Sequence, residues 1–183
     1  MININEYLLS KSKDNGIVFA NDNNVFEIVH KAIEERGNDA DLNYIDVSAC
    51  TTFCFSMNGI YKGLFERTDF QGDISEWDVS NVKDMRFTFA HCKNFNSDIS
   101  KWDVSNVKTM RKMFYLCESF NADISDWDVS NVEDMDCILY MCKSFDRDLS
   151  KWDVNNVTTG YHYAVYGTKT YNVAVYWPKF KRK

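Results

Sequence analysis

The motif Trp-Asp-Val-Ser-Asn-Val occurs four times with a single substitution, beginning at Trp77, Trp102, Trp127 and Trp152, always 25 residues apart. Self-similarity at a fixed period of roughly 20 to 50 residues is typical of chains that stack like units on one another. One unit cannot bury its own apolar face, so each unit must pack against its neighbours. This repeat constrains the fold more than any other feature of the chain.

Each unit is predicted to contain an extended segment followed by a helix. Residues 98–104 of the second unit are rich in Ile, Trp and Val, which favour strands. After Ser105, apolar residues follow at the spacing of one helix face: Val107, Met110, Phe114 and Cys117. We therefore predict an α/β repeat fold, a short leucine-rich-repeat-like solenoid of 25-residue strand-plus-helix units.

The two ends of the chain depart from the repeat. Residues 25–36 have a helical pattern between Asn24, a candidate N-cap, and Gly37, a helix stop. After residue 158 Tyr and Val alternate as in strands. We predict an N-terminal lead-in and capping helix over 1–45, four to five repeats over 46–158, and a β-rich C-terminal cap with a basic tail over 159–183.

The first unit is longer than the others. From Asp46 to Asp78 is 32 residues, an excess of seven over the period, and we place the excess near 54–61. Such irregularity is expected of a terminal repeat.

Composition and charge narrow the classes of partner. With 45% apolar and 26% charged residues, the chain is an ordinary globular sequence. The net charge of −6 disfavours nucleic acid and anionic membranes as partners, although the basic tail (Lys179, Lys181, Arg182, Lys183) leaves nucleic acid as an open alternative.

The sequence shows no signal-peptide pattern and no apolar run of about 18 residues, so we expect a cytoplasmic protein.

Cysteine recurs with the repeat, at Cys92, Cys117 and Cys142. Three stacked thiols cannot all pair, so we interpret them as buried small apolar side chains. Cys50 and Cys54 do not have the spacing of a zinc site. We expect no metal and no cofactor.

Trp and Asp also form ladders along the stack. We interpret Trp77, Trp102, Trp127 and Trp152 as core residues rather than as a surface for bases or sugars. Two series of Asp share this period: Asp73, Asp98, Asp123 and Asp148, then Asp78, Asp103, Asp128 and Asp153. They could bind calcium or accept backbone N–H groups in Asx turns. We favour the turns, because Asp-Val-Ser-Asn suits them.

Two sets of residues are candidates for binding a protein. Tyr115, Leu116, Tyr140, Met141 and Tyr166 should lie outside the predicted helices and form a partner or dimer surface. Otherwise the helix ends early and these side chains tuck under the next turn. Glu76, Lys101, Asp126 and Lys151 precede the four Trp and alternate in sign. They should set the register of the stack, or lie on the open binding face.

No catalytic motif is present: G-x-S-x-G, a P-loop, HExxH and G-x-G-x-x-G are all missing. His91 precedes Cys92, but adjacent helical residues point in different directions. We therefore expect no enzyme activity.

The unit Phe-Asn-x-Asp-Ile-Ser-x-Trp-Asp-Val-Ser-Asn-Val-x-x-Met-x-x-Met-Phe-x-x-Cys resembles the BspA-like leucine-rich repeat family, in the branch called DUF285 or mycoplasma lipoprotein-associated repeat, over about residues 40 to 158. The resemblance implies a solenoid that binds proteins or acts as an adhesin, often on a bacterial surface, without catalytic residues. Our first hypothesis is a non-catalytic protein-binding module. The alternatives are a phage or mobile-element inhibitor of a host nuclease or defence complex, an anti-CRISPR-type role that could include RNA contact, and a fragment of a surface adhesin.

Overall fold

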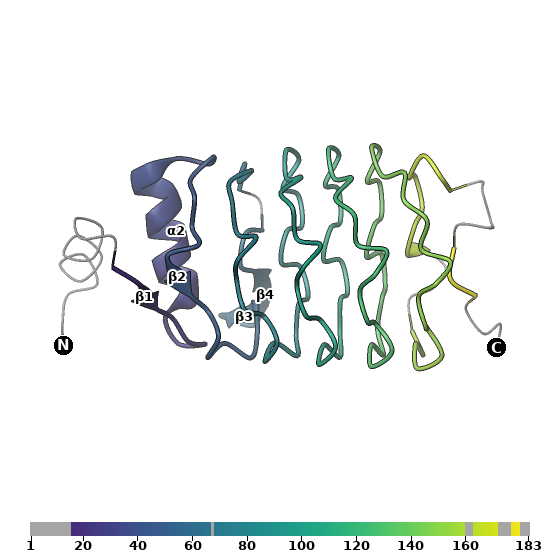
Figure 1. Ribbon diagram of the computed structural model, residues 1–183, viewed down its shortest axis with the longest axis horizontal. Coiled ribbons are helices and arrows are strands. Elements are labelled where there is room, and N and C mark those ends of the chain that lie inside the picture. Colours follow the sequence, from purple (N-terminus) through teal and green to yellow (C-terminus); the bar gives the residue numbers. More distant parts are fainter. Residues whose placement is uncertain (1–15, 67, 160–162, 172–176, 180–183) are drawn as a thin grey trace.

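The structure is a computed structural model that describes residues 16–66, 68–159, 163–171 and 177–179. Its regular elements all lie in the N-terminal third: β1 (Val18–Phe19), α2 (Val25–Arg36), β2 (Ile45–Asp46), β3 (Cys54–Met57) and β4 (Ile60–Gly63). β1 pairs with β2 in parallel, and β3 pairs with β4 antiparallel. Figure 1 shows the repeats side by side along the longest axis.

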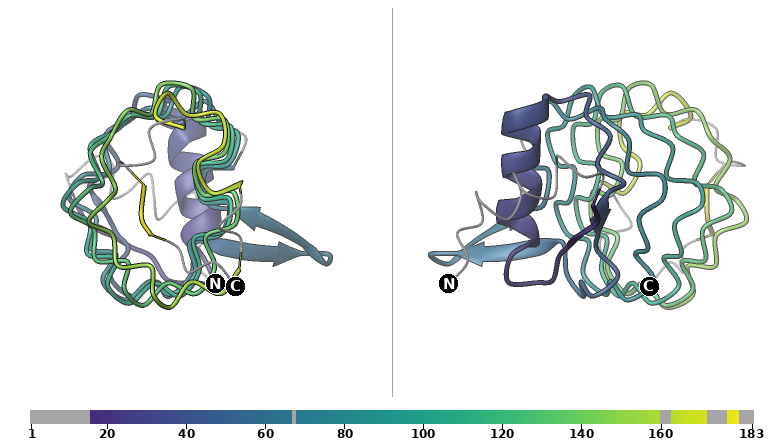
Figure 2. Two further views of the ribbon diagram at one scale, coloured as in Figure 1. Left: turned by 90° about the vertical axis from the view of Figure 1, so that its right-hand side faces the viewer. Right: turned by 60° about the vertical axis from the view of Figure 1, so that its left-hand side comes forward.

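Hydrogen bonds between main chains hold neighbouring repeats together. We call the circuits 70–94, 95–119, 120–144 and 145–169 rungs. Alternate N–H groups of one rung donate to carbonyls of the next at 2.8–2.9 Å: Met110 to Asp134, Lys112 to Asp136, Phe114 to Ile138 and Leu116 to Tyr140. Seen along the stack, the rungs superpose closely (Figure 2).

The predicted fold class, a leucine-rich-repeat-like solenoid of strand-plus-helix units with a helical and a β-rich cap, is wrong. The described residues contain one α-helix and two two-stranded sheets, and the described parts of 70–171 have no α-helix and no strand beyond isolated bridges. The segment 107–117 is a series of tight turns in which Met113, Tyr115 and Cys117 donate to the carbonyl three residues back.

Backbone geometry explains why these segments are not helices. Lys112 and Leu116 have φ of 54° and 61°, and their equivalents one rung on, Cys137 and Met141, have 55° and 59°. A left-handed residue ends an α-helix. Overlapping turns also return side chains to the interior about every third residue, so their apolar pattern matches that of a helix.

The C-terminal β-rich segment is not formed where the structure describes it. Residue 163 has 3-10 geometry and 164–171 are turns with one bend, and Tyr161, Val173, Val175 and Tyr176 lie outside the described residues.

The predicted helix over 25–36 is confirmed as α2. Val25, Ile28, Val29 and Ala32 are its buried face. Gly37 follows with φ of 93°, and its N–H donates to the Ile33 carbonyl. Asn24 stands at the N-cap, but its side chain makes no capping bond, because its Oδ1 accepts the N–H of Asn21.

Aromatic rings fill the interior of the stack. Phe pairs stack closely where one rung leads into the next, with centroids 3.9 Å apart for Phe89 and Phe95 and 4.0 Å for Phe114 and Phe120. The indole rings of Trp77 and Trp102 are parallel within 3°. Trp177 continues the 25-residue phase and packs half-buried against this core.

The seven extra residues of the first unit form part of a β-hairpin. β3 and β4 are joined by Asn58 and Gly59, both with positive φ (52° and 78°), the geometry of a two-residue type I′ turn. The hairpin projects sideways from the stack (Figure 2).

Candidate functional site

An aromatic row runs along one side of the stack. It consists of His91, Tyr115, Tyr140 and Tyr166. Tyr115 and Tyr140 stack with ring centroids 5.1 Å apart, and Tyr140 and Tyr166 at 5.3 Å, while His91 meets Tyr115 edge-on at 5.4 Å. Tyr166 is 41% exposed, and Tyr163 beside it is 56% exposed.

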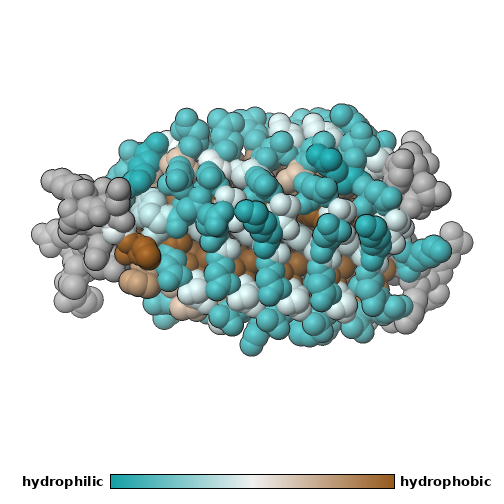
Figure 3. Space-filling view, in the orientation of Figure 1, coloured by the Kyte–Doolittle hydropathy of each residue, from teal (hydrophilic) through white to brown (hydrophobic). Residues whose placement is uncertain are grey.

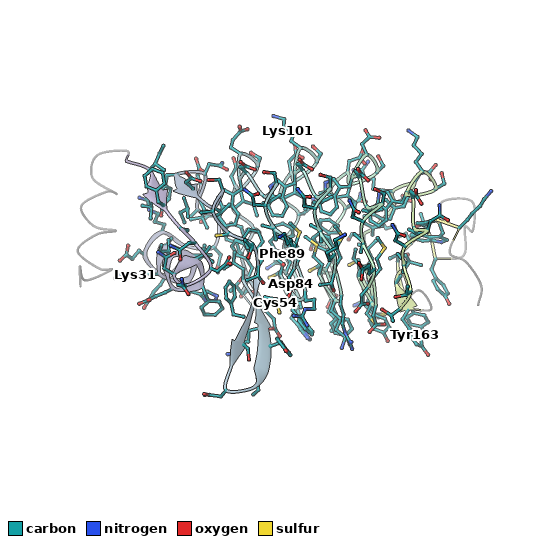
Figure 4. The ribbon with its side chains drawn as sticks, turned by 90° about the horizontal axis from the view of Figure 1, so that it is seen from below. Lys31, Cys54, Asp84, Phe89, Lys101 and Tyr163 are labelled. Atoms are coloured by element: carbon teal, nitrogen blue, oxygen red, sulfur yellow. The ribbon has the colours of Figure 1, made fainter. Side chains whose placement is uncertain are left out.

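Cations connect the row to the hairpin. The Arg86 guanidinium lies 4.7 Å from the ring of Tyr61 on β4. Lys112 Nζ lies 5.9 Å from the ring of Phe87 and 5.4 Å from that of Tyr115. Contacts therefore lead from the hairpin to the C-terminal rung. In Figure 4 the hairpin and Tyr163 lie on the same side of the stack.

Carboxylates hold the two arginines of this side. Asp84 accepts three bonds from Arg86, the shortest 2.6 Å. These hydrogen bonds raise the pKa of Arg86, so the guanidinium stays charged. Arg111 lies 3.5 Å from Asp136. The cations are thus fixed in position rather than free in solvent.

The sequence-predicted charge row lies on the opposite side of the stack. Figure 4 places Lys101 on the far side from the hairpin and Tyr163. Lys101 pairs with Glu76 at 3.8 Å and Lys151 with Asp126 at 4.0 Å, with all four side chains 68–87% exposed. Pairs this exposed contribute about 0.2–1 kcal/mol each. The two predicted sets therefore do not form one site.

A shallow polar depression of about 420 Å³ adjoins the charge row, lined in part by Asp39, Asp73, Asp98 and Lys101. Asp73 and Asp98 already accept N–H groups of Ser75 and Ser100. Figure 3 shows a largely hydrophilic face on which apolar atoms form narrow lines between rows of polar side chains.

Leu116 and Met141, the other predicted contact residues, are half-buried. A Cβ added at Gly167 would lie 2.4 Å from the Met141 sulfur, so Met141 packs on the backbone of the last rung. Tyr115 and Tyr140 are half-buried as well, and Tyr166 is the exposed member of the predicted set.

The interior ladders carry hydrogen bonds as well as apolar contacts. Each Trp of the motif donates its indole N–H to a carbonyl of the preceding unit at 3.0–3.1 Å: Trp77 to Leu42, Trp102 to Ile74, Trp127 to Ile99 and Trp152 to Ile124. The buried thiols donate at 2.7–3.0 Å: Cys92 to Phe65, Cys117 to Phe89 and Cys142 to Phe114. All six cysteines are free, and burial raises the pKa of Cys92 to about 12.

Both Asp series cap turns. Asp73, Asp98, Asp123 and Asp148, and Asp78, Asp103, Asp128 and Asp153, each accept the N–H two residues on at 2.8–3.1 Å. The Ser130 hydroxyl and N–H lower the pKa of Asp128. The Asx-turn interpretation is confirmed for these contacts.

Sequence reasoning missed one part of the aromatic side, the hairpin. The hairpin could have been found from Asn58-Gly59, which favours a two-residue turn. The 25-residue period alone would place Val165 beside Tyr140. The structure stacks it on Tyr166, and Met141 N–H donates to the Tyr166 carbonyl.

These features define a class of repeat protein whose stacked rungs display an aromatic and cationic side. The family described as "Mycoplasma protein of unknown function, DUF285" matches residues 56–177, well over half of the chain, so the chain belongs to this family. No curated protein and no solved structure gives a significant match. The described part of the chain has no helix of the length and apolarity needed to cross a membrane.

Proposed function

We propose that this protein is a non-catalytic protein-binding module and that the aromatic row is part of its contact surface. The observation that carries the proposal is the series of partly exposed tyrosines, Tyr115, Tyr140 and Tyr166, stacked at 5.1–5.3 Å. Tyr is enriched in the cores of protein interfaces, because it offers a large apolar ring with a polar tip.

The stacking of the row favours a protein over a nucleic acid. A base needs a free aromatic face on which to stack. The faces of Tyr115 and Tyr140 are turned toward one another within 14°, so the row presents ring edges and hydroxyl groups. The net charge of −6 adds long-range repulsion of phosphates.

The stacked rings are fixed before any partner arrives. A rigid row loses little side-chain entropy on binding, which favours affinity.

Affinity capture with matched variants tests the proposal. Tyr115, Tyr140 and Tyr166 are changed together to Ser, and recovery of proteins from lysate is compared with wild type. The control changes Glu76, Lys101 and Asp126 to Ser.

We expect at least one protein whose recovery falls strongly with the tyrosine variant and not with the control. Equal recovery with both variants contradicts the proposal. Because the tyrosines also stabilise one another, Tyr166→Ser alone is tested in parallel, with melting temperature as the check on folding. A captured nuclease or defence complex would indicate an inhibitor, and a host-surface protein an adhesin.

A further inference from the structure

We propose that the β3–β4 hairpin binds an extended, acidic segment of a partner protein, which adds to it as a third strand. The proposal rests on the protein-binding function above and specifies the chemistry of the partner. Four observations carry it: the preformed hairpin, its open edges, its exposed apolar side chains and the cations around its base.

The hairpin is a defined structure rather than a loose insertion. The Asn58-Gly59 turn fixes its register, with Ser56 opposite Tyr61 and Phe55 opposite Lys62. Each of its two faces is tied to the body. Phe55 meets Phe26 of α2 at 5.6 Å, and Tyr61 lies over Arg86 of the next rung.

Both strands of the hairpin are edges of a two-stranded sheet, and their open part lies around Ser56 and Tyr61, because the Cys54 backbone is bonded to Thr52 and the Gly63 N–H to Glu66. With a two-residue loop, the pair next to the loop exchanges hydrogen bonds, and the following pair, Ser56 and Tyr61, points its N–H and C=O groups outward. An isolated pair of strands is marginal in water and gains stability from a third strand. Unpaired edges are the usual template for adding an extended peptide.

The outer part of the hairpin is apolar. Ile60 is 64% exposed and Tyr61 is 52% exposed. They lie on opposite faces of β4, because successive side chains of a strand alternate. An added strand could therefore place apolar side chains beside both faces.

The charge around the hairpin selects the partner. Lys62 is exposed on β4. Arg86 and Arg111 occupy matching positions in successive rungs, with Phe87 N–H donating to the Arg111 carbonyl. Lys112 is the next cation toward the aromatic row.

Three carboxylates near the hairpin are already engaged. Asp84 binds Arg86, Asp136 binds Arg111, and Glu66 accepts the Gly63 N–H. Arg86 and Arg111 are thus paired, whereas Lys62 and Lys112 form no ion pair with a carboxylate of the described residues and provide the positive charge of this region. An approaching segment that carries Asp or Glu gains steering and specificity from this arrangement.

Selection from a random peptide library tests the chemistry directly. A dodecapeptide library displayed on phage is selected against the immobilised full-length protein, and enriched sequences are measured as labelled soluble peptides. We expect net-negative sequences in which Asp or Glu alternates with apolar residues. Enrichment of neutral or basic sequences overturns the proposal.

Two variants locate the binding. Ser56→Pro removes an outward N–H without removing a bond of the hairpin, and Lys62→Glu reverses an exposed charge. Ser56→Pro should raise the Kd of the selected peptides about tenfold through the loss of a hydrogen bond. Lys62→Glu should raise it about two- to fivefold through the loss of a surface ion pair. Both should leave the melting temperature unchanged. The matched control, Lys101→Glu on the opposite side, should leave Kd unchanged.

Unchanged affinity for both Ser56→Pro and Lys62→Glu overturns the proposal. Tighter binding of a mixed-sequence single-stranded RNA than of the peptides also overturns it, as does a dimer in sedimentation that Ser56→Pro abolishes. If cellular capture depends on the tyrosines but not on the hairpin, only this inference fails. If it depends on neither, the protein-binding function fails as well.

Discussion

Replacing Trp127 by Ala should destabilise the whole stack. Trp127 is 4% exposed, its ring lies 6.3 Å from that of Phe114, and its indole N–H donates to the Ile99 carbonyl at 3.1 Å. Removing a buried Trp costs about 3–5 kcal/mol. The Ile99 carbonyl keeps the bond from the Trp102 N–H, and loss of the indole hydrogen bond adds about 1 kcal/mol. The total approaches the whole stability of many domains, about 5–15 kcal/mol.

Thermal and urea unfolding followed by the fluorescence of the remaining tryptophans measure this loss. For a chain of this size, about 2–4 °C per kcal/mol predicts a fall in melting temperature of more than about 8 °C. Trp127→Phe keeps most of the apolar volume and loses the indole hydrogen bond, so it should cost only about 1–3 kcal/mol. A melting temperature for Trp127→Ala within about two degrees of wild type would refute the reasoning.

Three further outcomes follow from the contacts of single residues. Cys137 is the one half-exposed cysteine, and burial raises its pKa to about 11. Iodoacetamide should therefore label Cys137 before the other cysteines but at a slow rate, as mapped by mass spectrometry. Equal labelling of all six cysteines contradicts this prediction. Burial lowers the pKa of His30 below 6.5, so the unfolded state binds more protons and the free energy of unfolding should fall as pH drops through about 6.5. His30→Gln, which can still donate to the Leu64 carbonyl, should make the unfolding free energy from urea titrations less dependent on pH. An equally steep pH dependence in this variant refutes the prediction. Because Asp128 already accepts the Ser130 N–H, millimolar calcium should leave the melting curve unchanged, whereas a rise of several degrees would reveal a metal site.

The sequence predicts the features that depend on the 25-residue repeat or on residues adjacent in the chain. The positions of Trp127 and Cys117 in the interior follow from the 25-residue phase, because identical residues at a fixed period occupy equivalent places in a stack. The helix over 25–36 follows from its apolar face and from Gly37. The surplus near 54–61 locates the hairpin, although not its strands.

The second half of each unit was not predictable in the same way. Lys112 and Leu116 adopt positive φ although neither residue type prefers it. Their conformation is imposed by hydrogen bonds to the next rung, which a local pattern does not record. The partner of Tyr140 also depends on a one-residue offset of the last rung, so the aromatic row could be predicted only in part.

Because hydrogen bonds join only neighbouring rungs, the number of rungs can change without disturbing the bonds elsewhere in the stack. The indole of Trp127 reaches only the preceding rung, and Lys112 N–H only the next. Gain or loss of one 25-residue block by unequal recombination would therefore leave every remaining bond intact. It would also move the hairpin relative to Tyr166 by one strand spacing, about 4.8 Å. The distance between the hairpin and Tyr166 would thus change in fixed steps with the number of blocks.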